Sequence, residues 1–243
     1  MLDYLNLKSI MVIDIETIPQ VDNYDGLDEI TKELWISKRG KNKEENIEDG
    51  EFYFKNAGIL AEFGKIICIS TGFFIQNDSN WNFRIKSFYG DDEKKLLEEI
   101  GQLIDKQSKK SNEFGIAGHN INEFDIPYIC RRMLINDLPL PSYLANMAAK
   151  KPWEIKNIDT MQLWKFGDYK SYISLKLMTN ILNIPSPKDD IDGSQVASVY
   201  YSEKEGLERI RQYCQKDIIA VAQILLKFKN LPLLSSNQIS FAN

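Results

Sequence analysis

The alternation of hydrophobic and polar residues predicts strands in the first part of the chain. Residues 9–15 are largely apolar and β-branched apart from Asp14, a composition typical of a buried strand. Similar signals cover residues 65–75 and, after a polar turn, residues 81–89. Because only a short turn separates these two segments, we expect them to pair as an antiparallel hairpin.

Helical spacing replaces this alternation further along the chain. After the acidic pair Asp91-Asp92, leucine and isoleucine recur at helical intervals up to Ile104, which predicts a helix. Residues 114–120 predict a short buried strand, and Pro127 marks the beginning of another helix. The last part of the chain predicts helices near residues 172–182, 194–201 and 203–228. This order of elements indicates an α/β fold with a mixed sheet flanked by helices.

The stretch between Pro19 and Phe63 shows neither pattern. Its centre, residues 38–51, is almost entirely charged or polar, as expected for a solvated surface loop or a helical excursion. A chain of 243 residues, of which 43% are hydrophobic, is long enough for one sizeable α/β core. We therefore expect a single domain over residues 1–243, with an irregular excursion at about 21–62.

Charge and composition narrow the classes of function. The net charge of −5 argues against a protein that coats nucleic acid through a broad basic surface, although an enzyme that holds one strand end needs fewer cations. Three cysteines in apolar contexts and a single histidine leave almost no ligands for a structural zinc site, so any metal should be bound by oxygen. The chain shows no signal-peptide pattern and no apolar run of membrane-spanning length, so we expect a cytoplasmic protein without a membrane partner.

Two carboxylates stand on the first predicted strand, at Asp14 and Glu16. Because side chains alternate between the two faces of a strand, both carboxylates point to the same face. Like charges on an otherwise apolar strand repel each other and lose hydration, and a divalent cation such as Mg²⁺ or Mn²⁺ compensates both effects. The Asp-x-Glu pattern is not specific by itself, so its interpretation depends on the rest of the chain.

Two further acidic positions accompany this pair. Asp125 follows the fourth predicted strand and precedes Pro127, a place where aspartate also serves as an ordinary helix N-cap. Tyr213 and Asp217 lie one helical turn apart, at the margin of the apolar stripe of the last predicted helix. A tyrosine at such a margin is also compatible with simple packing.

The three segments together are specific. They read DIETIP at 14–19, GHNINEFDIPYICRR at 118–132 and YCQKD at 213–217. In this order they resemble the three exonuclease motifs of the DEDD superfamily of 3′→5′ exonucleases, in its tyrosine-bearing branch (DEDDy). Their sequences are most similar to those of stand-alone bacterial relatives of the proofreading exonuclease domain of family B DNA polymerases. The resemblance implies a ribonuclease H-like fold with a five-stranded mixed sheet and no polymerase domain.

The same resemblance implies hydrolysis of phosphodiester bonds by two metal ions, Mg²⁺ or Mn²⁺. Asp14 would bridge the two ions. Glu16 and Asp217 would bind the ion that carries the attacking water, and Asp125 would support the other. Tyr213 would orient that water. The residues expected near the substrate are Thr17, Asn120 and Phe124.

A stretch rich in lysine and aromatic residues covers residues 148–176. Lysines contact phosphates and aromatic rings stack on bases, a combination that suits single-stranded nucleic acid. Packing of the rings in the core is an equal alternative. The residues concerned are Lys150, Lys151, Lys156, Lys165, Lys170 and Lys176 with Trp153, Trp164, Phe166, Tyr169 and Tyr172.

The sequence therefore predicts a nucleic-acid partner with a free 3′ end, single-stranded DNA ahead of RNA, and it identifies no protein partner. The alternatives are an exoribonuclease of the same fold and a nucleic-acid-binding domain without catalysis. A haloacid dehalogenase-like phosphatase, whose nucleophile loop is Asp-x-Asp-x-Thr, is disfavoured because Glu16 stands at the position of its second aspartate.

Overall fold

The computed structural model describes residues 2–39, 48–78, 80–147, 150–151, 154–155, 157–168, 172–185 and 190–242. Its strands are β1 (Ile10–Pro19), β2 (Gly64–Asn77), β3 (Asn80–Tyr89), β4 (Gly115–Gly118), β5 (Ile158–Asp159) and β6 (Ile239–Ala242). Its helices are α1 (Glu29–Arg39), α2 (Asp49–Asn56), α3 (Glu93–Ser108), α4 (Asp125–Ile135), α5 (Ser142–Ala145), α6 (Thr160–Lys165), α7 (Leu175–Ile181), α8 (Val196–Ser202) and α9 (Gly206–Phe228). Short 3₁₀ helices are η1 (Leu7–Ser9), η2 (Tyr24–Gly26), η3 (Ala57–Ile59), η5 (Gly193–Gln195) and η6 (Ser236–Gln238).

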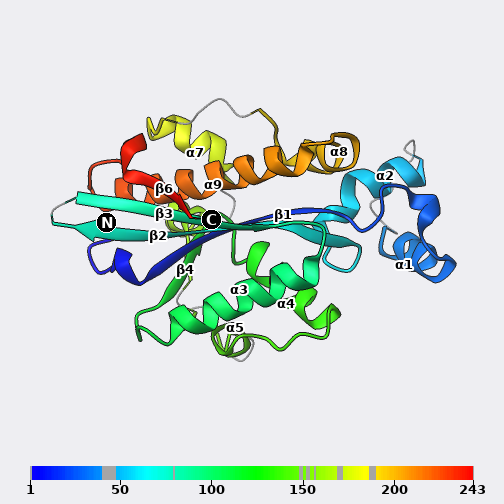
Figure 1. Ribbon diagram of the computed structural model, residues 1–243, viewed down its shortest axis with the longest axis horizontal. Helices are drawn as coiled ribbons and strands as arrows, with labels where there is room; N and C mark the ends of the chain where they lie inside the picture. The colour runs from blue at the N-terminus through cyan, green and yellow to red at the C-terminus, as the bar shows by residue number, and fades with distance from the viewer. Residues whose placement is uncertain are drawn as a thin grey trace.

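Within these residues the strands form one six-stranded mixed sheet in the order β5-β4-β1-β2-β3-β6 (Figure 1). β1 pairs antiparallel with β2 and parallel with β4, and β2 and β3 form the predicted antiparallel hairpin. The α/β class and the mixed sheet flanked by helices are confirmed. The expected count of five strands is one too low, because β6 adds a parallel edge strand beside β3. A strand of four residues is too short to leave a clear periodic signal in the sequence.

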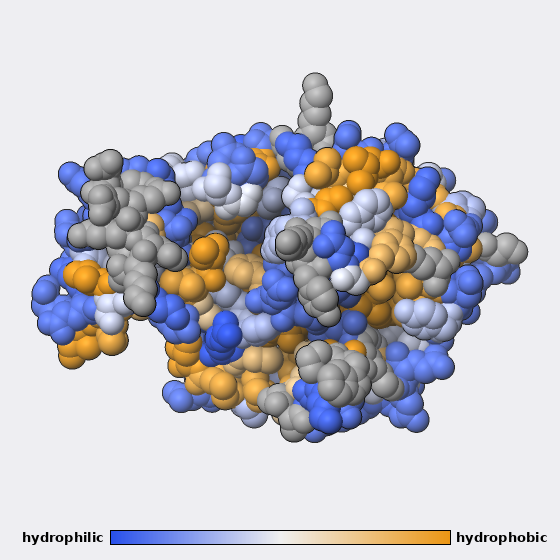
Figure 2. Space-filling view, turned by 180° about the vertical axis from the view of Figure 1, so that it is seen from behind, coloured by the Kyte–Doolittle hydropathy of each residue, from blue (hydrophilic) through white to orange (hydrophobic). Residues whose placement is uncertain are grey.

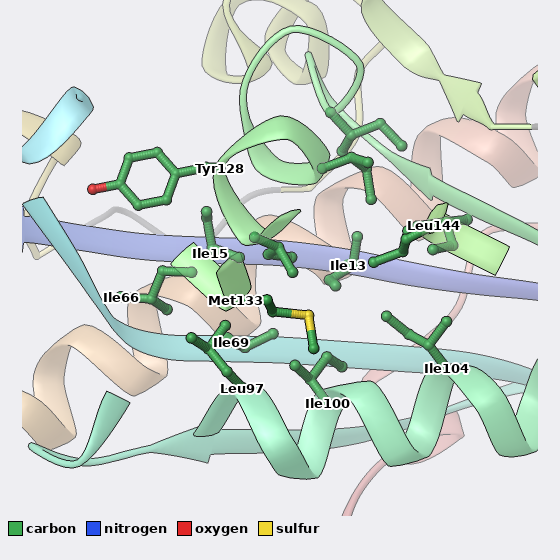
Figure 3. Close-up of a cluster of buried hydrophobic side chains, with 14 of the residues drawn as sticks. Ile13, Ile15, Ile66, Ile69, Leu97, Ile100, Ile104, Tyr128, Met133 and Leu144 are labelled. Atoms are coloured by element: carbon green, nitrogen blue, oxygen red, sulfur yellow. The ribbon is translucent and has the colours of Figure 1, made fainter. Parts of the chain in front are cut away.

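The two faces of β1 are covered by different helices. Ile13 and Ile15 point into the core that lies between the sheet and α3 and α4, as Figure 3 shows. Val12 points to the opposite face, into the core beneath α9. Because side chains alternate along a strand, Asp14 and Glu16 share the face of Val12 and lie on the side of α9.

A buried ion pair joins α3, α4 and β2. Glu93 and Arg132 are both buried, and the guanidinium donates hydrogen bonds to both carboxylate oxygens. Glu93 also accepts a hydrogen bond from the backbone N–H of Ile66 at 2.7 Å and another from the Asn136 amide. Arg132 donates in addition to the backbone carbonyl of Ala61 at 2.9 Å. Each charge thus has its counter-charge and further hydrogen bonds inside the protein.

The stretch expected to be irregular at about 21–62 contains helices, and we call residues 21–62 the insert. α1 and α2 lie beyond one end of the sheet (Figure 1). They enclose an aromatic cluster in which the ring centroid of Trp35 is 5.2 Å from that of Tyr53 and 5.1 Å from that of Phe63. These rings are too far apart in the sequence to form a periodic pattern. The hydrophobic pattern of this stretch therefore predicted no helix, and its polar residues were the clearest feature. The charged centre of the insert at 40–47 lies outside the described residues.

The C-terminal helices lie close to their predicted positions. α7 begins at Leu175 because the Ser174 side chain caps it, accepting a hydrogen bond from the backbone N–H of Leu177. The 23-residue α9 falls within its predicted range and α8 ends one residue beyond its own, whereas α5, α6 and β5 were not predicted. Among the described helices, none combines the length and the hydrophobicity that are needed to cross a membrane.

We expect Arg132→Ala to lower the free energy of unfolding by about 3–5 kcal/mol, because it leaves the Glu93 carboxylate buried without its cation. The neighbouring Arg131 is exposed, so Arg131→Ala is the matched control and should change stability by no more than about 0.5 kcal/mol. Urea unfolding followed by circular dichroism measures both. A similar small change for the two variants would show that the ion pair does not hold these elements together.

Candidate active site

Asp14 and Glu16 form the centre of the site, on the face of β1 that α9 covers. One carboxylate oxygen of each and the Cys214 sulfur lie within 4.8 Å of one another. Glu16 is buried and Asp14 is half-buried. The register between β1 and β2 shifts between Glu16 and Thr17. The extra residue, Ile67, is on β2, so the irregularity bends β2 opposite the part of β1 that carries Glu16.

Asp125 reaches this pair from the first turn of α4. The N-cap of α4 is Phe124, so the alternative interpretation of Asp125 as an ordinary N-cap is wrong. Its Oδ1 accepts a hydrogen bond of 3.1 Å from the backbone N–H of Ile15 instead. The pairing of β1 with β4 ends at Val12 and Ala117, so the edge of β1 is open at this point. The end of β4 thus makes room for the Asp125 carboxylate beside β1.

α9 supplies Tyr213 and Asp217, which lie one turn apart. The thiol of Cys214 between them donates to the backbone carbonyl of Asp14 at 3.5 Å, which places this part of α9 directly on β1. The Tyr213 hydroxyl hydrogen-bonds to Asp217, and Asp217 is close enough to raise the pKa of both Asp14 and Glu16. The structure therefore brings all four acidic residues of the three sequence motifs to one place.

The carboxylates resist ionisation where they stand. Burial raises the pKa of Asp14 and of Glu16 well above the ordinary range, and repulsion from the neighbouring carboxylates adds to the effect. Burial also raises the pKa of Asp125 to about 7, although backbone hydrogen bonds, among them that of Ile15, oppose the shift. Keeping all these groups ionised at neutral pH requires positive charge beside them.

The donor atoms of the site fit a divalent cation. Among the described residues, Asp14 Oδ2 and Asn120 Oδ1 are buried side-chain oxygens without a hydrogen-bond partner. Leaving a buried carboxylate oxygen unpaired costs free energy, and carboxylate and amide oxygens are the ligands that Mg²⁺ and Mn²⁺ prefer. Burial raises the pKa of the Cys214 thiol, so it stays protonated and is a poor metal ligand. The carboxylate oxygens of the cluster are therefore the candidate ligands.

Two pockets adjoin the carboxylates. One, of about 340 Å³, is lined in part by Tyr213 and Asp217. The other, of about 260 Å³, is lined in part by Glu16, Thr17 and Phe124. Two of the three residues expected near the substrate thus line a pocket that also includes a carboxylate of the site.

Asp159 is a buried carboxylate that sequence reasoning missed. It is 2% exposed, and it accepts hydrogen bonds from the backbone N–H groups of Asn120 at 3.0 Å and Asn122 at 3.2 Å while it caps α6. It thereby fixes the turn between β4 and α4, in which Asn120 has a left-handed backbone conformation with φ 64°. The only available signal was an aspartate between an apolar residue and a helix, which many strand-to-helix junctions share.

His119 connects the end of β4 to the segment before α7. Its Nδ1 lies 2.9 Å from the Thr160 hydroxyl and its Nε2 lies 2.9 Å from the backbone carbonyl of Ile173. Burial lowers its pKa, which favours the neutral ring. In that form Nε2–H donates to the carbonyl of Ile173. The Thr160 hydroxyl beside Nδ1 donates to the backbone carbonyl of Gly118 at 3.1 Å, so the ring lies in a set of contacts that hold these segments together.

The stretch at 148–176 divides between core and surface. Trp164 packs against the apolar cluster that α7 and α9 share. Phe166 and Tyr172 are exposed, the Lys165 ammonium lies 5.7 Å from the centre of the Tyr172 ring, and Lys176 lines the larger pocket. The residues of this stretch outside the described ranges are Ala148, Ala149, Pro152, Trp153, Lys156, Tyr169, Lys170 and Ser171.

Comparison with known proteins identifies a family that matches most of the chain. The family described as "Predicted 3'-5' exonuclease related to the exonuclease domain of PolB" matches residues 59–236, a range that includes Asp125, Tyr213 and Asp217 but begins after Asp14 and Glu16. No curated protein matches the chain.

Among solved structures, the family B DNA polymerase from the hyperthermophilic archaeon Pyrobaculum calidifontis is similar over 90% of this chain, with a TM-score of 0.54 and 12% sequence identity. The chain spans 24% of the length of that polymerase. At this identity the likeness is one of fold, and it confirms the ribonuclease H-like architecture.

We expect Asp14→Asn to raise the melting temperature of the metal-free protein at pH 8, because the variant removes a buried like charge. Because the pKa of Asp14 is raised in the folded protein, the wild-type penalty is absent only well below the ordinary pKa of 3.8, where the carboxyl is protonated in both states, and it grows as pH rises from there toward the folded pKa. The gain in melting temperature of Asp14→Asn over the wild type should therefore become smaller as pH falls.

Differential scanning calorimetry in EDTA measures this gain, with the exposed Asp3→Asn as control. Added Mg²⁺ should raise the melting temperature of the wild type and not that of Asp14→Asn, because only the wild type keeps the full ligand set. A variant that melts below the wild type in EDTA at pH 8 would contradict this account of the site.

Proposed function

Because the chain belongs to the family of predicted 3′-5′ exonucleases related to the exonuclease domain of PolB, we propose that it hydrolyses phosphodiester bonds from the 3′ end of single-stranded DNA. The observation that carries the proposal is the convergence of four carboxylates, which β1, α4 and α9 deliver to one place. Phosphodiester hydrolysis needs such a cluster, since carboxylates can hold the divalent ions that the reaction uses.

Two divalent ions, Mg²⁺ or Mn²⁺, are the proposed cofactors. Asp14 has a buried unpartnered oxygen and lies among the other three carboxylates, so it would contribute to holding both ions. Glu16 and Asp217 would hold one ion with it, and Asp125 would hold the other. When bound, the ions would supply the positive charge that stabilises the attacking and leaving oxygens of an in-line displacement.

Tyr213 is proposed to orient the attacking water by a hydrogen bond. Burial and the neighbouring carboxylates raise its pKa above the ordinary value of about 10, so the phenol keeps its proton at neutral pH. A protonated phenol can position a water but cannot take a proton from it. The hydrogen bond to Asp217 holds the hydroxyl close to the carboxylates.

Thr17 and Phe124 are proposed to contact the terminal nucleotide, because they line the same pocket as Glu16. Asn120 is proposed to lie near the substrate as well. It stands on the turn that Asp159 fixes, and its side-chain oxygen is buried without a hydrogen-bond partner among the described residues. The exposed rings of Phe166 and Tyr172, with Lys165 and Lys176 nearby in the chain, suit stacking and phosphate contact with the rest of a single strand. DNA is proposed ahead of RNA because the family is related to a DNA polymerase domain.

With Mg²⁺ or Mn²⁺, the protein should shorten 5′-labelled single-stranded DNA stepwise from its 3′ end, and excess EDTA should abolish the reaction because the carboxylates alone repel phosphate. Denaturing gels of 5′- and 3′-labelled DNA, with duplex DNA and RNA of the same sequence alongside, measure polarity and substrate together. Hydrolysis in excess EDTA, or release from the 5′ end, would contradict the proposal. Degradation of RNA alone would identify an exoribonuclease, and metal-independent binding without degradation would identify a silent binding domain.

Variants of the site should lose activity in a graded order. Asp217→Asn should nearly abolish turnover because it removes a proposed metal ligand. Tyr213→Phe should lower kcat by about 10- to 100-fold, the cost of one hydrogen bond to a charged group. His119→Ala should matter least, because its ring contacts Thr160 and Ile173.

Single-turnover rates measure this order, with Tyr200→Phe as the matched control, since the Tyr200 hydroxyl bonds to Asp91 instead. A His119→Ala protein that stays folded and binds metal, yet loses as much activity as Asp217→Asn, would overturn the assignment of roles.

A further inference from the structure

We infer that the insert forms one wall of a pocket for the base of the 3′-terminal nucleotide, and that Phe54 and Ile59 are the residues of the insert that hold this base. The inference rests on the proposed function, and it assigns a role to a part of the chain that contributes none of the four carboxylates. Residues 21–58 of the insert also lie outside the family match.

The pocket of about 260 Å³ is built from separate parts of the chain. The end of β1 contributes Glu16 and Thr17, and α2 and η3 contribute Phe54 and Ile59. Phe124 lines it from the loop before α4, and residues of η5 and α8 complete it. In Figure 2 the part of the insert that contains α1 and α2 lies at the left edge of the molecule, with a hollowed surface beside it that contains apolar side chains.

The insert is fixed against the elements that carry the carboxylates. A Cβ at Gly58 would lie 3.2 Å from the backbone of Ile18, so glycine allows η3 to rest directly on β1. The Tyr128 hydroxyl of α4 donates to the backbone carbonyl of Gly58 at 2.8 Å, and Arg132 of α4 donates to that of Ala61. The wall formed by η3 therefore keeps a fixed distance from β1 and α4.

The chemistry of this wall suits a nucleobase. Ile59 is 60% exposed although it is large and apolar, and Phe54 is half-buried with its ring centroid 6.2 Å from that of Tyr201. Apolar and aromatic side chains at a pocket bind the uncharged face of a base, which every base offers whatever its sequence. Exposed apolar groups that line a pocket point to a binding surface rather than to packing.

The position of the pocket indicates that its occupant is the terminal nucleoside and not another part of the strand. In the proposed reaction, hydrolysis takes place at the phosphate beside the ions that the carboxylates would hold, and Glu16 belongs both to that cluster and to the pocket. A volume of about 260 Å³ lies just below the range of pockets for drug-sized ligands, so it has room for one nucleoside and not for two. The nucleoside on the 3′ side of the reacting phosphate is the group within reach.

The test compares two single-stranded DNA substrates that differ only in whether the 3′-terminal nucleotide carries a base or is a stable abasic analogue. The wild type should cleave the terminal bond with a kcat/KM about 5- to 100-fold higher when the base is present, the effect of one stacked base. Ile59→Ala and Phe54→Ala should bring this ratio close to one, mainly through KM. Ile59→Trp should narrow the pocket and penalise the substrate with the base more than the abasic one.

Ile36→Ala is the matched control, because Ile36 is an exposed isoleucine of the same insert that does not line the pocket. It should keep the wild-type ratio. Ile59 is exposed, so its variants should fold even if Phe54→Ala does not. A wild type that degrades both substrates equally, or an Ile59→Ala protein with the wild-type ratio, would overturn the inference alone. A folded wild type that degrades neither substrate would overturn the proposed function and the inference with it.

Discussion

Repulsion between buried carboxylates is the constraint on which the rest of the structure depends. Asp14 and Glu16 stand on one face of the central strand, where burial and their acidic neighbours raise the pKa of both groups. A fold that places them there must hold the backbone firmly, because the side chains alone would separate. β1 is held by β2 and β4 on its edges, by α9 on one face and by α3 and α4 on the other.

The protein contains buried carboxylates of two kinds, and hydrogen bonding separates them. Glu93 is neutralised by Arg132 and bonded to Ile66 and Asn136, and Asp159 accepts several backbone N–H groups. Both serve the fold, and each is satisfied within the protein. Asp14 differs from them because one of its oxygens is buried without a partner among the described residues. Burial of an acid is therefore not by itself a sign of function here, whereas an incomplete set of partners is.

Much of the fold followed from local patterns, because strands and long helices repeat their hydrophobic residues at fixed intervals. The alternation around Asp14 and Glu16 predicted both their strand and their common face, and the stripe along α9 placed Tyr213 and Asp217 on one margin. The sequence left open whether the centre of the insert is a loop or a helical excursion, because the core of the insert consists of a few aromatic rings distant in sequence. Asp159 was missed because its partners are backbone N–H groups of a turn far away in the chain, which no local pattern records. Long-range contacts therefore mark the limit of what the sequence predicts.

The shortness of β4 has a consequence for how this protein tolerates change. Its pairing with β1 stops at Ala117, and a Cβ at Gly118 would lie 2.9 Å from the carbonyl oxygen of Ile13, so the chain leaves the strand just where a side chain would not fit. The next N–H of β1 toward that edge, at Ile15, is then taken by Asp125. The same donor cannot serve both a longer β4 and the carboxylate. A change that extended the strand ladder by one more pair would make the sheet more regular and expel an acidic group from the site, while every residue of the three motifs remained in place. A longer pairing of β1 with β4 and the present position of the Asp125 carboxylate therefore depend on the same backbone N–H, that of Ile15.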